Sequence, residues 1–121
     1  MATNVSSATQ VFDHHIDALI KGDLDELVSD YTESSLVIAG EQVAKGRKAI
    51  GEFFGGFLSG LLKPGTYKLG VDVKHVEGDI VYVLWHAKCQ PADIVFAGDT
   101  FVIRDGKIAV QTVAAKIEPH N

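Results

Sequence analysis

The spacing of the apolar residues changes once along this chain of 121 residues. Up to Leu62 they recur every three or four positions, as on one face of an α-helix, whereas from Tyr67 onward they alternate, as on a β-strand. Helices followed by a run of strands are typical of an α+β domain, in which the helices cover one face of an antiparallel sheet. The length allows one core, so we expect a single domain over residues 1–121, with flexible ends at 1–6 and 118–121.

Three segments carry the helical spacing. The first ends at Gly22, a residue that commonly follows a helix. The second begins at Asp23 with Glu26 three residues later, which is the arrangement of a capping box, and its apolar face includes Tyr31. The longest predicted helix covers residues 47–62.

The alternating segments predict four long strands separated by turn-forming residues: 67–77, 80–90, 94–104 and 108–117. A short strand at 36–39 and a weaker one at 42–45 precede the longest helix.

An aspartate interrupts the apolar pattern of the third long strand. Asp99 shares one face of that strand with Val95, Ala97, Phe101 and Ile103, and the opposite face is no more polar. We therefore expect Asp99 to be at least partly buried. A buried carboxylate costs several kcal/mol unless it is paired, hydrogen-bonded or protonated, which makes Asp99 a candidate functional group.

Composition excludes several classes of function. The formal net charge of −5 leaves no basic stripe for nucleic acid, and no apolar stretch is long enough to span a membrane. The single Cys89 excludes an internal disulfide and a cysteine-rich zinc site. His14 and His15 are adjacent on a helix and cannot both face one ion, so we expect no metal and no cofactor. The polar start of the chain favours a cytoplasmic protein.

Five segments together resemble the NTF2-like superfamily, and most closely its SnoaL-like and ketosteroid-isomerase-like branch: Gly22–Asp25, Tyr31–Ser35, Gly46–Phe54, Gly98–Phe101 and Ile103–Ile108. The resemblance extends from about residue 11 to residue 117. It implies a cone, in which a strongly curved, mostly antiparallel sheet wraps around three N-terminal helices and leaves a pocket at the open end. It also implies a homodimer formed through the sheet. The motifs identify the fold but not the reaction, because this cone hosts many activities.

The resemblance assigns positions to individual residues. Asp99 occupies the place of the protonated aspartate in the oxyanion hole of ketosteroid isomerases, and His15 that of the tyrosine which donates the second hydrogen bond. The catalytic base of that branch is replaced by Ala39, which carries no proton, so steroid isomerisation is not expected. From the residues alone, His15 is equally a histidine at the edge of the core that is satisfied by a backbone carbonyl.

Matching to the family also turns His86 and Tyr82 toward the pocket. The candidate catalytic residues are therefore Asp99, His15 and His86, and the candidate ligand-binding residues are Tyr82, Gln111, Phe101, Phe54 and Tyr31. In this register Trp85 lies with its apolar neighbours on the outer face, where a second copy of the chain would cover it. The alternative is that the two faces are exchanged and Trp85 belongs to the core.

Two classes of function fit these residues. One is an enzyme that acts by acid–base chemistry on a small apolar or aromatic molecule, with Asp99 as the acid or hydrogen-bond donor and a histidine as its partner. The other is a non-catalytic homodimer that binds a ligand or a partner through the same cone, with Asp99 as a structural carboxylate.

Overall fold

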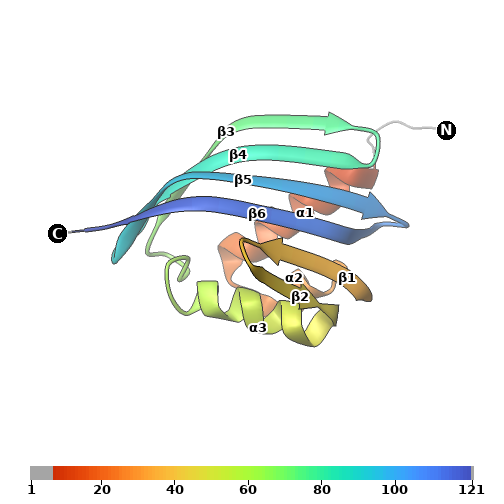
Figure 1. The fold of residues 1–121 in the computed structure, drawn as a ribbon, viewed down its shortest axis with the longest axis horizontal. Helices are drawn as coiled ribbons and strands as arrows, with labels where there is room; N and C mark the ends of the chain where they lie inside the picture. The colour runs from red at the N-terminus through yellow and green to blue at the C-terminus, as the bar shows by residue number, and fades with distance from the viewer. Residues whose placement is uncertain (1–6, 121) are drawn as a thin grey trace.

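The computed structural model describes residues 7–120, and over this range three helices precede or interleave with six strands. In chain order the elements are α1 (Ser7–Lys21), α2 (Leu24–Val28), β1 (Tyr31–Ala39), β2 (Gln42–Lys45), α3 (Gly46–Leu58), β3 (Lys68–Glu77), β4 (Ile80–Lys88), β5 (Ala92–Arg104) and β6 (Lys107–Pro119). Figure 1 shows α1 behind the long strands and α3 beside β1 and β2. The predicted α+β class is confirmed. Within the described range no helix is both long and apolar enough to cross a membrane.

The six strands form one sheet in the order β2-β1-β6-β5-β4-β3. Every neighbouring pair is antiparallel except β1 and β6, which run parallel. The register shifts between Val71 and Val73 in β3 and between Ile94 and Phe96 in β5. Because an extra residue bends a strand and increases its twist, these bulges help the sheet to curve around the helices (Figure 1). The expected strongly curved, mostly antiparallel sheet is therefore present.

The core lies between the concave face of the sheet and the helices. From α1 the side chains of Phe12 and Leu19 are buried, and from α3 those of Ile50 and Phe54. They belong to one cluster that reaches every layer of the domain. Burying each such side chain contributes about 1.5–3 kcal/mol, so the helical faces that the apolar spacing identified hold the sheet in its curved form.

Two helix predictions need correction. The helix predicted for 47–62 ends at Leu58, where the backbone N–H of Ser59 donates to carbonyl oxygens of the last turn and its hydroxyl donates to that of Gly55. Tyr31 does not belong to α2 but begins β1, and its side chain is fully buried. By contrast, the predicted cap is present, since a carboxylate oxygen of Asp23 accepts the backbone N–H of Glu26.

The faces of β4 are opposite to the prediction. Val81 and Val83 point toward the helices and are buried, whereas the Tyr82 side chain faces outward and is 41% exposed. Trp85 therefore lies on the inner face, and its predicted place on the outer face was wrong. The physical reason is that side chains alternate with a period of two, so a register slip of one residue exchanges the faces of a whole strand.

The last strand is longer than predicted. Glu118 and Pro119 pair with β5 as part of β6, where a flexible end was expected. His120 follows them, and its ring lies 3.0 Å from a carboxylate oxygen of Asp93. The other residues of the predicted ends, 1–6 and 121, lie outside the described range.

Candidate ligand-binding site

A cavity lies between α1, α3 and the inner face of the sheet. Its volume is about 50 Å³, several times the roughly 10–15 Å³ that one water needs. Its walls are mostly apolar: Phe12, His15, Ile16, Leu19, Phe53, Phe54, Phe57, Leu62, Leu69, Val71, Val83, Trp85, Asp99, Phe101, Gln111 and Val113. An apolar cavity with a few convergent polar groups is the usual form of a small-molecule site.

Asp99 is the one carboxylate among the residues described around this cavity. It is 7% exposed, and each of its oxygens accepts one hydrogen bond. The indole N–H of Trp85 donates to Oδ1 at 2.8 Å, and the amide N–H of Gln111 donates to Oδ2 at 2.9 Å. Burial raises the pKa of Asp99 above its ordinary value, and these two hydrogen bonds oppose the rise without cancelling it.

A chain of hydrogen bonds continues from Asp99 to α1. The hydroxyl of Tyr31 donates to Oε1 of Gln111, and the same hydroxyl lies 3.4 Å from Nδ1 of His15. Gln111 and Tyr31 are almost completely buried, and burial raises the pKa of Tyr31 well above its ordinary value. Four side chains from α1, β1, β5 and β6 are thus connected through one buried network.

His15 is a neutral histidine inside this network. Burial, with a smaller effect of the neighbouring His14, lowers its pKa to about 4. The imidazole packs edge-on against the rings of Phe54 and Phe101 and lines the cavity. Nδ1 of the ring contacts the Tyr31 hydroxyl and not a backbone carbonyl, so the structure favours a histidine of the site over one satisfied at the edge of the core.

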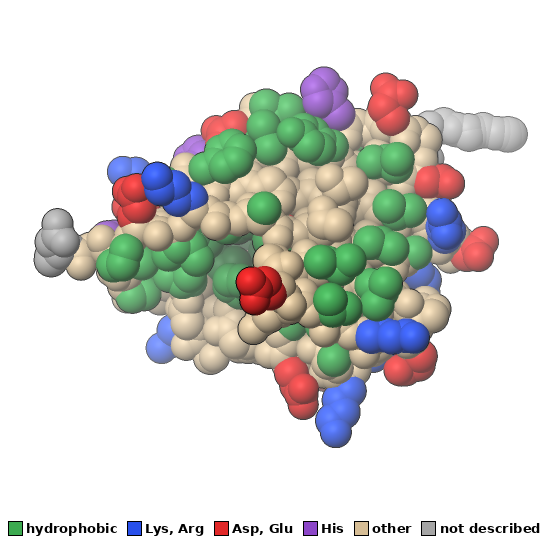
Figure 2. Space-filling model, in the orientation of Figure 1, with side chains coloured by type: hydrophobic (Ala, Val, Ile, Leu, Met, Phe, Trp, Pro, Cys, Tyr) green, Lys and Arg blue, Asp and Glu red, His purple; other side chains and the backbone are tan. Residues whose placement is uncertain are grey.

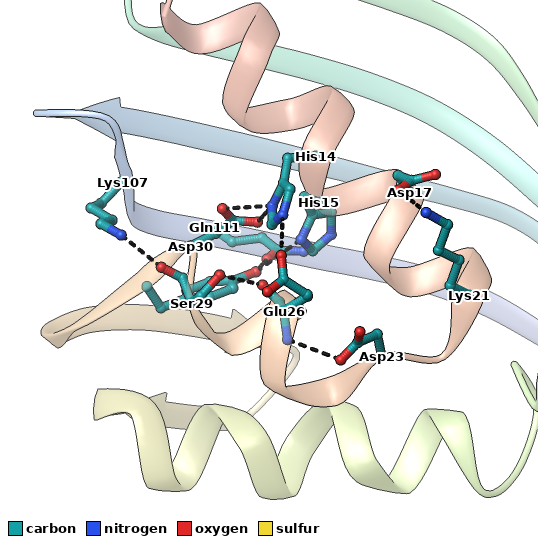
Figure 3. A network of polar contacts seen from close by, with 11 residues as sticks. His14, His15, Asp17, Lys21, Asp23, Glu26, Ser29, Asp30, Lys107 and Gln111 are labelled. Carbon is teal, nitrogen blue, oxygen red and sulfur yellow. Dashed lines mark hydrogen bonds and ion pairs between the residues drawn. The ribbon is translucent and has the colours of Figure 1, made fainter.

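A second set of contacts ties the same elements together nearer the surface. His14 Nδ1 lies 2.7 Å from Asp30 Oδ2, and its Nε2 lies 2.9 Å from Glu26 Oε1 (Figure 3). The bonds to Asp30 and then to Glu26 raise the pKa of His14, while burial raises the pKa of Asp30 more than His14 lowers it. Consecutive residues of α1, 14 and 15, therefore hold consecutive residues of the α2–β1 segment, 30 and 31. This double attachment fixes the place of Tyr31 relative to the cavity.

The structure brings together most of the predicted site residues. Asp99, His15, Gln111, Phe101 and Phe54 line the cavity, and Tyr31 is buried within the network that joins three of them.

Two predicted residues lie elsewhere. Tyr82 and His86 face the outer side of β4, and His86 is bonded at 2.9 Å to Asp72 and lies over Gly70. The prediction that they point into the pocket was wrong because of the same one-residue slip that misplaced Trp85.

Trp85 is the site residue that the sequence prediction placed outside the pocket. The signal that could have found it is the alternation of β4, which puts Trp85 on the same, entirely apolar face as Val83.

Comparison with known families decides the classification. The model of the SnoaL-like domain matches residues 12–111, which is most of the chain. This chain belongs to the SnoaL-like family.

Solved structures with this SnoaL-like fold have low sequence identity to the chain. The SalBIII enzyme, described as epoxide hydrolase/cyclase-like with a role in pyran ring formation in the polyether salinomycin, is 20% identical with a TM-score of 0.77, over 93% of this chain and 95% of that one. Protein SMa1630 of Sinorhizobium meliloti, a proposed polyketide cyclase, is 20% identical with a TM-score of 0.74, over 86% and 93%. A proposed ketosteroid isomerase from Kribbella flavida is 14% identical with a TM-score of 0.75, over 95% and 81%. A search of curated proteins found no match.

The resemblance to ketosteroid isomerases places His15 at the position of a tyrosine and Ala39 at the position of the catalytic base, and the structure keeps only the first of these two near the cavity. Ala39 pairs with Val113 at the end of β1 and is not among the residues around the cavity. Nor does any group of three or more His, Cys, Asp or Glu side chains within residues 7–120 form a metal-binding arrangement. The groups available for chemistry at the cavity are therefore the Asp99 carboxyl, the His15 imidazole and the donors that hold them.

Proposed function

We propose that this SnoaL-like domain binds a small, largely apolar or aromatic molecule carrying one polar oxygen, and that Asp99 and His15 are its polar contacts. The observation that carries the proposal is the apolar cavity whose single carboxylate is held by Trp85 and Gln111. A carboxyl group in such a cavity orients an otherwise apolar ligand, because its hydrogen bond fixes both the distance and the direction of the polar group of the ligand.

The two groups suit acid–base chemistry of the isomerase, hydrolase or dehydratase type. Because its pKa is raised, Asp99 can be protonated and can donate this proton to a ligand oxygen. The donation would accompany cleavage of the bond between that oxygen and its carbon, or the change of a carbonyl into an enol. A neutral His15 with a pKa of about 4 is a weak base at neutral pH, so its better role is to hold the ligand by a hydrogen bond. The cyclase and isomerase descriptions of the similar structures support this class of chemistry without specifying the substrate.

Calorimetry with 2-naphthol and naphthalene tests the binding proposal. A hydrogen bond to a charged or strongly polar group contributes about 1.5–3 kcal/mol, so the protein is expected to bind 2-naphthol roughly ten-fold or more tightly than naphthalene. In Asp99→Leu this preference should disappear, while the affinity for naphthalene should persist because the apolar walls remain.

The matched control is Asp25→Asn, which alters an exposed carboxylate on α2 and should leave the preference unchanged. A preference for 2-naphthol that is the same in Asp99→Leu as in the parent protein would show that Asp99 does not hold the ligand.

The runner-up is a homodimer that binds a ligand or partner without catalysis, and the outer face of the sheet favours its dimeric form. Ile80, Tyr82 and Phe96 on this side are 44%, 41% and 53% exposed. In the view onto this face, several groups of hydrophobic side chains lie over the strands, and most charged side chains lie toward the edge of the view (Figure 2). We propose that a second copy of the chain covers this face, since exposed apolar side chains that gather on one face favour an interaction site.

Analytical ultracentrifugation of Tyr82→Asp tests the dimer. We expect the parent protein to sediment as a dimer and Tyr82→Asp to dissociate, because a carboxylate would be buried at the interface without a partner. Ile20→Asp, which changes an exposed apolar residue of α1, should remain dimeric. A monomeric parent protein would exclude this arrangement.

A further inference from the structure

The hydrogen bonds of the buried network all point in one direction. Gln111 uses its amide N–H groups toward Asp99, and its amide oxygen accepts from Tyr31. The single hydrogen of the Tyr31 hydroxyl is therefore committed to Gln111. For the contact between Tyr31 and Nδ1 of His15 to be a hydrogen bond, Nδ1 must carry the proton. An ionised Asp99 thus requires the Nδ1–H tautomer of His15, with a free lone pair on Nε2.

The same atoms can be connected in the opposite direction. If Asp99 carries a proton on Oδ2, that oxygen becomes a donor toward Gln111. A half-turn of the Gln111 amide then places its oxygen toward Asp99 and its N–H groups toward Tyr31. The Tyr31 hydroxyl turns to donate to His15 Nδ1, which must now be unprotonated, so the imidazole proton resides on Nε2. Every contact of the chain is kept and each donor has become an acceptor.

Intermediate arrangements are disfavoured by burial. Gln111 is 1% exposed and Tyr31 is fully buried, so a donor that faces a donor in this chain has no water to turn to. The bond from Trp85 to Oδ1 of Asp99 is the same in both arrangements and does not choose between them. The network therefore has two complete states and no satisfied state between them.

Asp99 is the member of the network whose charge can select the state. Tyr31 has a raised pKa and His15 a lowered one, so both stay neutral around neutral pH. The titratable groups that flank the network from outside are His14 on α1 and Asp30 before β1. These two side chains bond to each other and to no member of the buried network. Trp85 and the apolar rings of α3 complete the surroundings of the cavity.

We propose that Gln111 is a reversible amide relay, through which the protonation of Asp99 sets the tautomer of His15 and thereby the polarity of the cavity. Nδ1 is engaged with Tyr31, which leaves Nε2 as the ring nitrogen available to a ligand. With Asp99 ionised, both ends of the network offer acceptors and suit a hydroxyl donor such as a phenol or an enol. With Asp99 protonated on Oδ2, Nε2 offers an N–H and suits a carbonyl oxygen. The relay is a property of the ligand-free protein, so its test can fail while ligand binding at the cavity stands. In the relay the Asp99 proton faces Gln111, and a ligand oxygen that takes this proton has to replace Gln111 as its acceptor.

Nitrogen-15 NMR of the histidine rings in the ligand-free protein tests the relay. The ¹³C signal of the Asp99 carboxyl reports the titration of this group. As the pH falls through the pKa of Asp99, His15 is expected to pass from the Nδ1–H to the Nε2–H form. In Asp99→Asn the side-chain amide can donate to the Gln111 oxygen while its own oxygen accepts from Trp85. That variant should show the Nε2–H form throughout the range from about pH 5 to 8, where a histidine with a pKa of about 4 stays neutral.

Two further variants separate the relay from a general change of environment. Trp85→Phe removes the other donor to Asp99 and should leave the Nδ1–H form in place at high pH. Tyr31→Phe cuts the chain and should make the His15 tautomer the same whether residue 99 is Asp or Asn. Titration of Asp99 with no change of tautomer would mean that the proton goes to the cavity side of the carboxyl, and this would overturn the relay. A His15 tautomer that still depends on residue 99 in Tyr31→Phe would also overturn the relay.

Discussion

Replacing Gln111 with leucine is expected to lower the free energy of unfolding by about 2–4 kcal/mol. The amide of Gln111 donates to Asp99 at 2.9 Å and accepts the hydroxyl of Tyr31, and both partners are buried. Leucine has a similar volume and leaves little cavity, so the loss comes from one missing hydrogen bond at each of two buried polar groups and not from packing; Asp99 keeps its bond from Trp85 and Tyr31 its contact with His15. Urea denaturation at pH 7 measures it.

The control for this substitution is Thr112→Val in the next position of β6. Thr112 faces outward and is exposed, so its replacement is expected to change stability by no more than about 0.5 kcal/mol. The loss in Gln111→Leu should also become smaller toward acidic pH. Because burial raises the pKa of Asp99, the folded protein protonates this group readily as the pH falls, and a neutral carboxyl is less costly to leave unpaired than a carboxylate. Equal losses in the two variants, or a loss that does not change with pH, would contradict the role assigned to Gln111.

The arrangement of elements could be predicted from the sequence because the apolar period differs between helices and strands. The change near residues 62–67 separates α3 from β3, and the cap at Asp23 locates the start of α2. The errors arose where local pattern and tertiary packing disagree. Tyr31 continues the helical spacing of α2, yet it is the first residue of β1. Its ring is buried in the core and its hydroxyl donates to Gln111. Contacts between distant segments decide such positions, and no local pattern contains them.

The site was predictable in part for a related reason. Alternation in β5 places Asp99 with Ala97 and Phe101, and all three are buried. The bulge then moves Val95, expected on the same face, to the surface, where it is 42% exposed. A bulge adds one residue without a marked sequence signal, and everything beyond it changes face. The same period of two explains why one slip in β4 misplaced Tyr82, His86 and Trp85 together.

The position of Ala39 limits what family membership implies for function. The chain keeps the SnoaL-like cone and a buried carboxyl at Asp99, but a group that carries no proton stands where the resemblance places a base. The remaining polar groups at the cavity form one connected network and not an acid and a base that act separately. Chemistry at this site is therefore expected to depend on how the network distributes its protons, which makes Gln111 as informative a target as Asp99.

Replacing Gly22 with alanine is expected to lower the free energy of unfolding by about 2–5 kcal/mol. Gly22 follows α1 with a φ of +73°, and a β-carbon built there would lie 2.3 Å from Cγ of Pro64, in the turn after α3. The left-handed backbone alone costs roughly 1–2 kcal/mol for a residue with a side chain, and the collision adds to it. Gly40→Ala isolates the first part, because Gly40 has a φ of +59° and nothing within 4 Å of the added carbon. Chemical denaturation of both variants should therefore show the larger loss at Gly22, and equal losses would mean that Pro64 moves aside freely. Since Leu62, two residues before Pro64, is a wall of the cavity, that movement would also change the site.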